Sequence, residues 1–186
     1  TREVILGTAE GGKKIFLAGI NLLEGAMKDG YGDFAGNPAE SLNHYYIKTI
    51  HHEFTHILNQ NKEYSESFTQ ISPTTYVGDA CFDTDNYWRG RGYITAYAQS
   101  EHTEDFAELL SEYITHNAEW WQAQLDAAHS ETEEVRKTDP EAGYGDEYIE
   151  SKIDIVRSYM QDAWGIDIDK LRDIVQRRFS DVASGL

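Results

Sequence analysis

Five consecutive residues in the first third of the 186-residue chain, His52-Glu53-Phe54-Thr55-His56, limit its fold more than any other feature. Residues four apart on a helix lie on one face, one turn above each other. Two imidazoles placed in this way can bind one Zn²⁺ at about 2.0–2.1 Å each. Glu53 follows the first histidine, so its carboxylate can reach a metal-bound water without ligating the metal and can take its proton. The pattern therefore predicts a helix whose histidine face meets further ligands, with Glu53 as general base.

The residues before the motif also indicate a helix. Asn37-Pro38-Ala39-Glu40 has the form of a helix start, because asparagine caps helices and proline suits the first helical position. We expect this helix to run to about Gln60. The apolar spacing predicts a buried stripe made of Ile47, Ile50, Phe54, Ile57 and Leu58.

A catalytic zinc site needs three protein ligands and one open position, so a third ligand must come from elsewhere. The later histidine used by one large class of such sites is absent, because Asn59 and Lys62 occupy the positions of its glycine and histidine. A second helix, expected to begin with Thr103 as its N-cap, carries Glu104 and Glu108 one turn apart. One of these carboxylates can ligate the metal while the other accepts a hydrogen bond from a zinc-bound imidazole. The alternative is that the two glutamates have this spacing by chance, because the chain contains 33 acidic residues.

The remaining segments predict an α+β, mostly helical fold with one small sheet. Residues 3–20 contain two short apolar stretches around Gly11-Gly12, which is typical of a β-hairpin. Residues 72–97 are rich in glycine and tyrosine, and we interpret them as a long ordered loop with a short strand near its end. Amphipathic helices are expected around residues 148–160 and 171–179.

Charge and cysteine content exclude several classes of protein. The formal net charge of −17 repels phosphate backbones and anionic membranes, so no nucleic-acid partner is expected. Cys81 is the only cysteine, so neither an intramolecular disulfide nor a cysteine-rich zinc site can form. No apolar run is long enough to span a membrane. Because the chain starts at Thr1 and not at Met, we expect a processed or trimmed form whose targeting segment is absent.

The order of these motifs resembles that of known zinc metallopeptidases. A His-Glu-x-x-His helix followed by Glu-x-x-x-Glu on a later helix is similar to the gluzincin branch. Tyr97 precedes Glu104 by seven residues, a spacing that resembles the lethal-factor type. The sequence from Tyr45 to Glu112 also resembles bacterial envelope lipoproteins described as substrate-import-associated zinc metallohydrolases. The stretches that carry this likeness are HHEFTHILNQ, YVGDA and RGYITAYAQSEHTEDFAELLSEY.

The resemblance implies a role for each matching residue. His52, His56 and Glu104 become the ligands of one Zn²⁺ per chain. Glu53 becomes the general base, and Glu108 the partner that orients a zinc-bound imidazole. A gluzincin-like domain is then expected, with a small N-terminal sheet, an active-site helix, a glutamate-ligand helix and C-terminal helices.

Aromatic residues and a strand edge are predicted near the metal. The resemblance implies that Tyr97 supplies the hydroxyl that stabilises the oxyanion of the tetrahedral intermediate. Tyr87, Trp88 and Tyr93 lie between the two halves of the metal site in sequence and are candidates for a substrate wall. The strand expected over Ile15–Ile20 is a candidate edge for pairing with an extended peptide.

The likeness fades after Ala128, so we divide the chain into a zincin-like catalytic domain, 1–128, and a C-terminal helical extension, 129–186, that packs on the same domain. The resemblance further implies an exported protein of the cell envelope or cell surface, lipid-anchored through an N-terminal segment absent here. Outer-membrane nutrient-uptake components are its implied partners.

The expected function is that of a zinc metallopeptidase acting on a peptide or protein. Two alternatives stay open. A zinc amidase could act on a glycopeptide or cell-wall substrate, because the motif specifies the activated water and not the bond it attacks. An accessory lipoprotein of a nutrient-uptake system could retain the metal and serve as a binding module. A degenerate site tends to lose its base first, so the presence of Glu53 argues against this last alternative.

Overall fold

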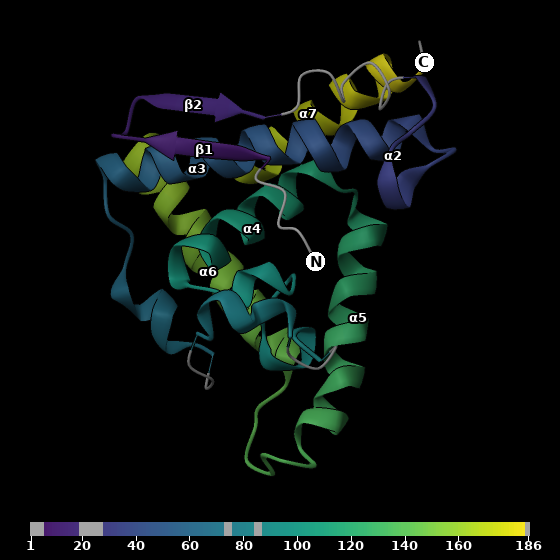
Figure 1. The fold of residues 1–186 in the computed structure, drawn as a ribbon. Helices are drawn as coiled ribbons and strands as arrows, with labels where there is room; N and C mark the ends of the chain where they lie inside the picture. Colours follow the sequence, from purple (N-terminus) through teal and green to yellow (C-terminus); the bar gives the residue numbers. More distant parts are fainter. Residues whose placement is uncertain (1–5, 19–27, 73–75, 84–86, 185–186) are drawn as a thin grey trace.

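Helices make up most of the molecule, as the α+β, mostly helical prediction requires (Figure 1). The computed structural model describes residues 6–18, 28–72, 76–83 and 87–184. Its helices are α2 (Pro38–Leu42), α3 (Thr49–Asn61), α4 (His102–Thr115), α5 (Ala118–Val135), α6 (Gly145–Trp164) and α7 (Ile168–Ala183).

The N-terminal sheet is a hairpin of two antiparallel strands, β1 (Gly7–Glu10) and β2 (Lys14–Leu17). Its register places Gly7 opposite Leu17 and Glu10 opposite Lys14. Gly11 and Gly12 form the turn at φ values of 58° and 65°, a left-handed conformation that glycine adopts without steric cost. The predicted hairpin is thus confirmed in its described part, and it lies along helix α3 (Figure 1).

The helix that carries the histidine motif contains a π-helical segment. Helix α2 begins where the sequence predicts, with Pro38 in its first turn and the Asn37 side chain accepting a hydrogen bond from the Glu40 amide at 3.2 Å. The π-helical segment Asn43–Lys48 follows directly and passes into α3. A π-turn holds one more residue than an α-turn and occurs often at functional sites. The predicted helix is therefore present over its expected length, with a change of register before the motif.

Helix α4 lies at the centre of the molecule. Every residue from Asp105 to Thr115 is buried, because α3 packs on one side of α4 and the C-terminal helices α6 and α7 pack on others. Its apolar side chains, among them Phe106, Leu109 and Ile114, are almost fully buried. Several α4 side chains are nevertheless charged or polar, and burial of such groups is costly unless they are paired. The partners of these groups determine what α4 does.

The start of α4 differs slightly from the prediction. The helix begins at His102, and Glu101 occupies the cap position. Thr103 is already inside the first turn, where its hydroxyl donates a hydrogen bond to the Glu101 carboxylate. Its side chain is therefore engaged with Glu101 instead of capping the helix.

The stripe predicted to be the buried face of α3 is only partly correct. Ile57 and Leu58 are buried, but Ile50 and Phe54 are 39% and 46% exposed. The helix turns its histidine-bearing side toward α4 instead. An apolar pattern gives the wrong face here because the polar groups of α3 find partners on α4.

The segment between α3 and α4 is built mainly from 3-10 turns. The expected ordered loop is present in its described part, but the short strand expected near its end is not formed. The Gly92 amide bonds to the Arg89 carbonyl and the Tyr93 amide to the Trp88 carbonyl, so these groups close a turn and do not join a sheet. The turns lie at Glu66–Gln70, Gly78–Phe82, Arg89–Arg91 and Tyr97–Gln99.

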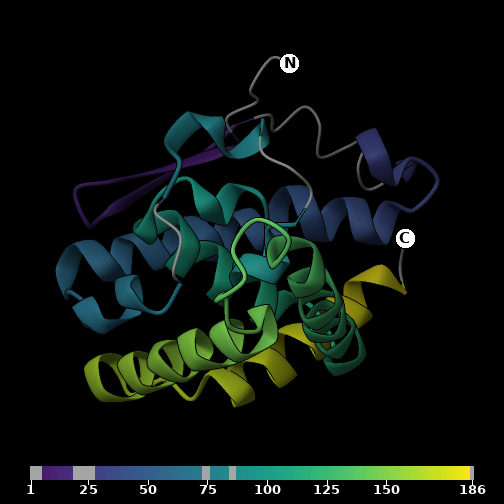
Figure 2. The same cartoon turned by 90° about the horizontal axis from the view of Figure 1, so that it is seen from below.

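The residues after 128 share the main core with the helices that carry the metal-site residues (Figure 2). This core extends from Leu58 to Ile168 and includes residues of α4, α5 and α6. Helix α5 passes through Ala128 without a break, and the division into 1–128 and 129–186 stays a prediction. None of the described helices is both long and apolar enough to cross a bilayer.

Candidate metal centre

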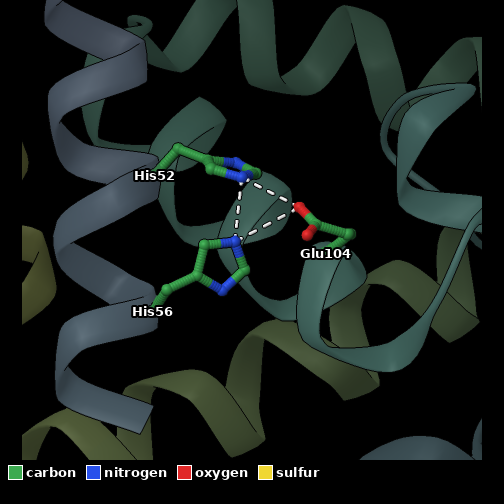
Figure 3. A group of neighbouring side chains, drawn as sticks. All are labelled: His52, His56 and Glu104. Atoms are coloured by element: carbon green, nitrogen blue, oxygen red, sulfur yellow. Dashed lines mark hydrogen bonds and ion pairs between the residues drawn. The ribbon is translucent and has the colours of Figure 1, made fainter. Parts of the chain in front are cut away.

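Three predicted ligands come together between α3 and α4. His52 and His56 project from one face of α3 toward Glu104 in the first turn of α4 (Figure 3). Glu104 Oε2 lies 2.9 Å from His52 Nε2 and 3.2 Å from His56 Nε2, and the two Nε2 atoms are 3.1 Å apart. Of the two carboxylates that the spacing left open, Glu104 is therefore the one that faces both histidines.

The triangle fits a zinc ion. Two ligand atoms at about 2.0–2.1 Å from zinc and at the tetrahedral angle lie roughly 3.3 Å apart. The three observed separations of 2.9, 3.1 and 3.2 Å are close to that value. Two nitrogens and one oxygen are also a donor set of catalytic zinc sites, which keep a fourth position open. In the described part of the chain, this is the one group of three such side chains whose ligand atoms are close enough to hold a metal.

Glu108 lies one turn further along α4 and supports the first histidine. Its Oε1 is 2.9 Å from His52 Nδ1, the ring nitrogen that faces away from the triangle. Its Oε2 accepts hydrogen bonds from Lys48 Nζ and from the Thr95 hydroxyl, each at 2.8 Å. The carboxylate therefore occupies the place predicted for a residue that orients a metal-bound imidazole.

The pKa values follow from this crowding of charges in a buried place. Burial alone would lower the pKa of His52, but the carboxylates of Glu104 and Glu108 outweigh it and raise the pKa to about 9. Burial would likewise raise the pKa of Glu104, yet hydrogen bonds to His52 and His56 lower it to about 2. The carboxyl group of Glu104 is thus ionised over the whole neutral range. Strong perturbation of several neighbouring groups in a cleft is typical of a functional site.

Glu53 lies at the side of the triangle, under the hairpin. The residue is 6% exposed, and burial raises the pKa of its carboxyl group, while His52 and His56 act in the opposite direction. Strand β1 crosses so close that a Cβ atom on Gly7 would lie 2.8 Å from Glu53 Cγ and 3.0 Å from Thr49 Cγ2. Any larger residue at position 7 would displace the Glu53 side chain.

Tyr97 also lies at the site. Its ring centroid is 6.2 Å from that of His52, and the ring stacks on Phe82 at 6.0 Å with planes only 9° apart. Tyr97 comes from the 3-10 turn that precedes α4. The spacing of seven residues before Glu104 therefore does bring this phenol near the metal ligands.

Two hollows meet beside the triangle, and both are bordered by Gly7, His52, Glu53 and Tyr97. The larger, about 1140 Å³, is called the carboxylate cleft here because Glu63, Glu66 and Glu101 line it. The smaller, about 600 Å³, is called the aromatic pocket because Tyr31, Tyr45 and Phe82 line it. His52, Glu53 and Tyr97 thus stand between two surfaces of different chemistry.

The predicted substrate wall is wrong for Tyr93. This tyrosine is 1% exposed, and its ring contacts the buried Lys152 ammonium at 4.1 Å from its centroid. Tyr87 and Trp88 do not line either hollow. Tyr64 and Tyr76 line the carboxylate cleft instead. Position between two motifs in sequence could not separate aromatic residues of the core from those of the cleft.

Sequence reasoning missed Lys48, Thr95 and Glu112. Lys48 lies four residues before His52, and Glu112 lies four residues after Glu108, so both continue the stripes already recognised. Lys48 Nζ is 2.9 Å from Glu112 Oε1. This repeat of four was a usable signal. Thr95 had none, because a loop positions its hydroxyl.

Comparisons with known proteins agree with this geometry. The model of a family described as "putative zinc-binding metallo-peptidase" matches residues 1–169. The crystal structure of a putative zinc-binding metallo-peptidase from Bacteroides caccae is similar, with 31% sequence identity and a TM-score of 0.72. The match covers 97% of this chain and 60% of that one, so the chain spans well under two thirds of the length of its solved relative. No curated protein matches the chain.

Proposed function

The chain belongs to the family described as putative zinc-binding metallo-peptidases, and from this premise we propose that it is a zinc-dependent hydrolase that cleaves a peptide bond. The observation that carries the proposal is the triangle of His52, His56 and Glu104, whose atoms lie at the separations that one zinc ion requires. We propose one zinc per chain. The match covers only 60% of the solved relative. The activity of the whole protein is therefore also a proposal.

The three ligands would hold the metal between α3 and α4. A bound zinc ion polarises a carbonyl group and makes a water molecule acidic enough to be activated at neutral pH. His52 and His56 supply neutral imidazole nitrogens, and Glu104 supplies an ionised carboxylate. Glu108 fixes the ring of His52 from behind, so that Nε2 points into the triangle.

Glu53 would move the proton. A carboxylate oxygen of Glu53 takes a proton from the attacking water and then delivers it to the nitrogen of the leaving amine. Burial raises the pKa of this carboxyl group, and a raised pKa brings a carboxylate closer to the strength that a general base needs at neutral pH. Gly7 above Glu53 leaves the carboxylate in place, because a side chain at that position would collide with it.

Tyr97 would stabilise the charge that develops on the carbonyl oxygen. Its phenol can donate a hydrogen bond to that oxygen, a contribution that grows as the oxygen becomes negative. The stack on Phe82 holds the ring in one orientation. Tyr97 borders both hollows, which places it where a substrate crosses from one to the other.

The substrate would lie extended along β1. Gly7, Thr8 and Ala9 of this strand line the carboxylate cleft, and β1 pairs with β2 on one side only among the described strands. An extended peptide can add to such an edge through main-chain hydrogen bonds. We propose β1 for this edge because β2 lines neither hollow. The strand expected over Ile15–Ile20 stays a prediction, and its residues 19 and 20 lie outside the described part. Basic side chains would suit the carboxylate cleft, and aromatic ones the aromatic pocket.

Metal analysis and a peptide library test the proposal together. Protein purified without chelator is expected to contain close to one zinc per chain, and His56→Ala to lose it. Glu53→Gln is expected to keep the zinc and to lose hydrolysis of the library. Glu150→Gln, the same change on an exposed face of α6, is the matched control and should behave as wild type.

Two results would contradict the proposal. Wild-type protein without zinc, and without affinity for it, would remove the metal site altogether. A zinc-loaded wild type as inert as Glu53→Gln across the library would leave a metal-retaining binding module as the better description.

A further inference from the structure

Six side chains form a ladder of charges between α4 and the helix that carries the histidine motif. Lys48, the last residue of the π-helical segment, is followed every four residues by His52 and His56 on α3. Glu104, Glu108 and Glu112 repeat in the same way on α4. His56 meets Glu104, His52 meets both Glu104 and Glu108, and Lys48 meets both Glu108 and Glu112. The metal triangle occupies one end of this ladder, and Lys48 stands at the other.

Lys48 determines how Glu108 is oriented. The Lys48 ammonium and the Thr95 hydroxyl both donate to Oε2 of Glu108, each at 2.8 Å. With Oε2 held by two donors, Oε1 is left to face His52 Nδ1 at 2.9 Å. Side chains held by charge-assisted hydrogen bonds have little freedom to rotate. The direction of the His52 ring therefore depends on a lysine that does not touch the metal triangle.

Lys48 also balances charge. Glu108 and Glu112 are 4% and 5% exposed and stand one turn apart, so without a cation two buried carboxylates would face each other. Lys48 lies 2.8 Å from Glu108 Oε2 and 2.9 Å from Glu112 Oε1, so its ammonium bridges the two carboxylates and offsets their repulsion. The other oxygen of Glu112 lies 3.0 Å from His116 Nδ1, which leaves Lys48 as the cation that joins Glu112 to Glu108.

We propose that Lys48 is a positioning residue of the metal centre, which fixes Glu108 so that His52 presents Nε2 to the metal. The proposal rests on the proposed zinc site. It predicts that removal of the ammonium group weakens zinc binding without removing any ligand. Loss of a group that orients a zinc ligand typically costs about 10- to 100-fold in metal affinity.

The test is the zinc affinity of Lys48→Met, measured by competition with a chromophoric chelator. Lys62→Met is the control, because Lys62 lies at the end of the same helix and contacts Ala163 and Trp164 at the far end from Lys48. We expect an affinity loss of about 10- to 100-fold for Lys48→Met and wild-type affinity for Lys62→Met. The visible spectrum of the cobalt-substituted protein, which reports ligand geometry, should change for Lys48→Met alone.

Two further measurements separate the possible failures. Thr95→Val removes the other donor to Glu108 Oε2 without changing charge, and it should weaken zinc binding in the same direction but less. Circular dichroism of the metal-free variants establishes that they are folded, and if Lys48→Met does not fold, Thr95→Val decides. Wild-type affinity and cobalt spectrum in a folded Lys48→Met, or in Thr95→Val when it must decide, would overturn the role of Lys48. Failure of wild type to bind zinc would instead overturn the proposed function.

Discussion

Two lysines, Lys48 and Lys152, reach carboxylates of helix α4 from different helices, and their surroundings are unlike. Lys48 comes from the π-helical segment and meets two carboxylates, Glu108 and Glu112. Lys152 comes from α6 and meets one, Asp105, at 2.6 Å, with the Gly92 carbonyl at 2.8 Å. The Lys152 side chain is fully buried and that of Lys48 is 12% exposed, so the larger difference is the number of negative charges around each.

This difference reverses the direction of the pKa shift. Burial lowers the pKa of both lysines, but the two glutamates around Lys48 outweigh burial and raise its pKa, whereas Asp105 alone does not outweigh it for Lys152. Burial likewise raises the pKa of Asp105 against the attraction of Lys152. A single buried ion pair often gains less from attraction than it loses in desolvation. On one side of α4 the neighbouring charges therefore outweigh the cost of burying the lysine, and on the other side they do not. We expect the Lys152–Asp105 pair to add little stability.

The largest effect is expected from removing one member of the weaker pair. Lys152→Met leaves Asp105 buried without its cation, and we expect the free energy of unfolding to fall by about 3–5 kcal/mol. Zinc content of the folded protein should stay at the wild-type level, because Lys152 does not contact the ladder. Urea unfolding and metal analysis measure the two quantities.

The double variant Lys152→Met with Asp105→Asn sharpens this result. Both charges are then gone, and the asparagine oxygen can still accept the hydrogen bond that Tyr76 donates to Asp105 at 2.9 Å. We expect most of the lost stability to return. Equal destabilisation of the single and double variants would mean that the pair itself stabilises the fold, and the contrast between the two lysines would disappear.

A smaller effect is expected from pH, on the ladder side only. In metal-free protein the carboxylates raise the pKa of His52 from 6.5 to about 9 despite burial. A pKa raised on folding gives stability that is complete below pH 6.5 and is lost as pH rises through 9. The free energy of unfolding should therefore fall by about 3 kcal/mol across this window. His52→Gln should flatten the slope, and the Lys152 double variant should retain it. A slope that survives His52→Gln would assign it to other groups.

The smallest effect tests whether strand β1 of the hairpin determines the position of Glu53. Gly7→Ala places a methyl group 2.8 Å from Glu53 Cγ, so the carboxylate must move. Small displacements of a reacting group reduce rates strongly, and we expect roughly a tenfold lower kcat/KM for peptide hydrolysis. Zinc affinity should not change, because the ligands are not displaced. Unchanged hydrolysis would show that Glu53 tolerates the move and that β1 is only a cover.

The sequence was most informative where polar side chains repeat every four residues along a helix. His52, His56 and Glu104 were predicted from that spacing alone or with a resemblance, and the structure brings all three together. The same repeat of four also includes Lys48, one turn before His52. Roles in catalysis, the cell-envelope location and the nutrient-uptake partners stay predictions, since no geometry of the chain tests them.

The failures have a common physical cause. Ile50 and Phe54 were expected inside because apolar residues usually are, but α3 buries its charged face against paired charges on α4. Tyr93 was expected at the cleft, yet its ring covers the buried ammonium of Lys152. Both errors come from tertiary pairing of charges, which no local pattern of apolar residues contains.

The π-helical segment Asn43–Lys48 lies between α2 and α3. For the packing of this continuous helix, the number of residues in the segment matters more than their identity. Leu42, just before the segment, and Tyr46, within it, pack with Phe179 of α7, and after the segment the polar face of α3 meets α4. Loss of one residue would convert the π-turn to an α-turn and rotate one half against the other by about 100°. Either the contact with α7 or the ladder would then be lost. Among relatives, alignment gaps should therefore avoid this segment even where its side chains vary freely.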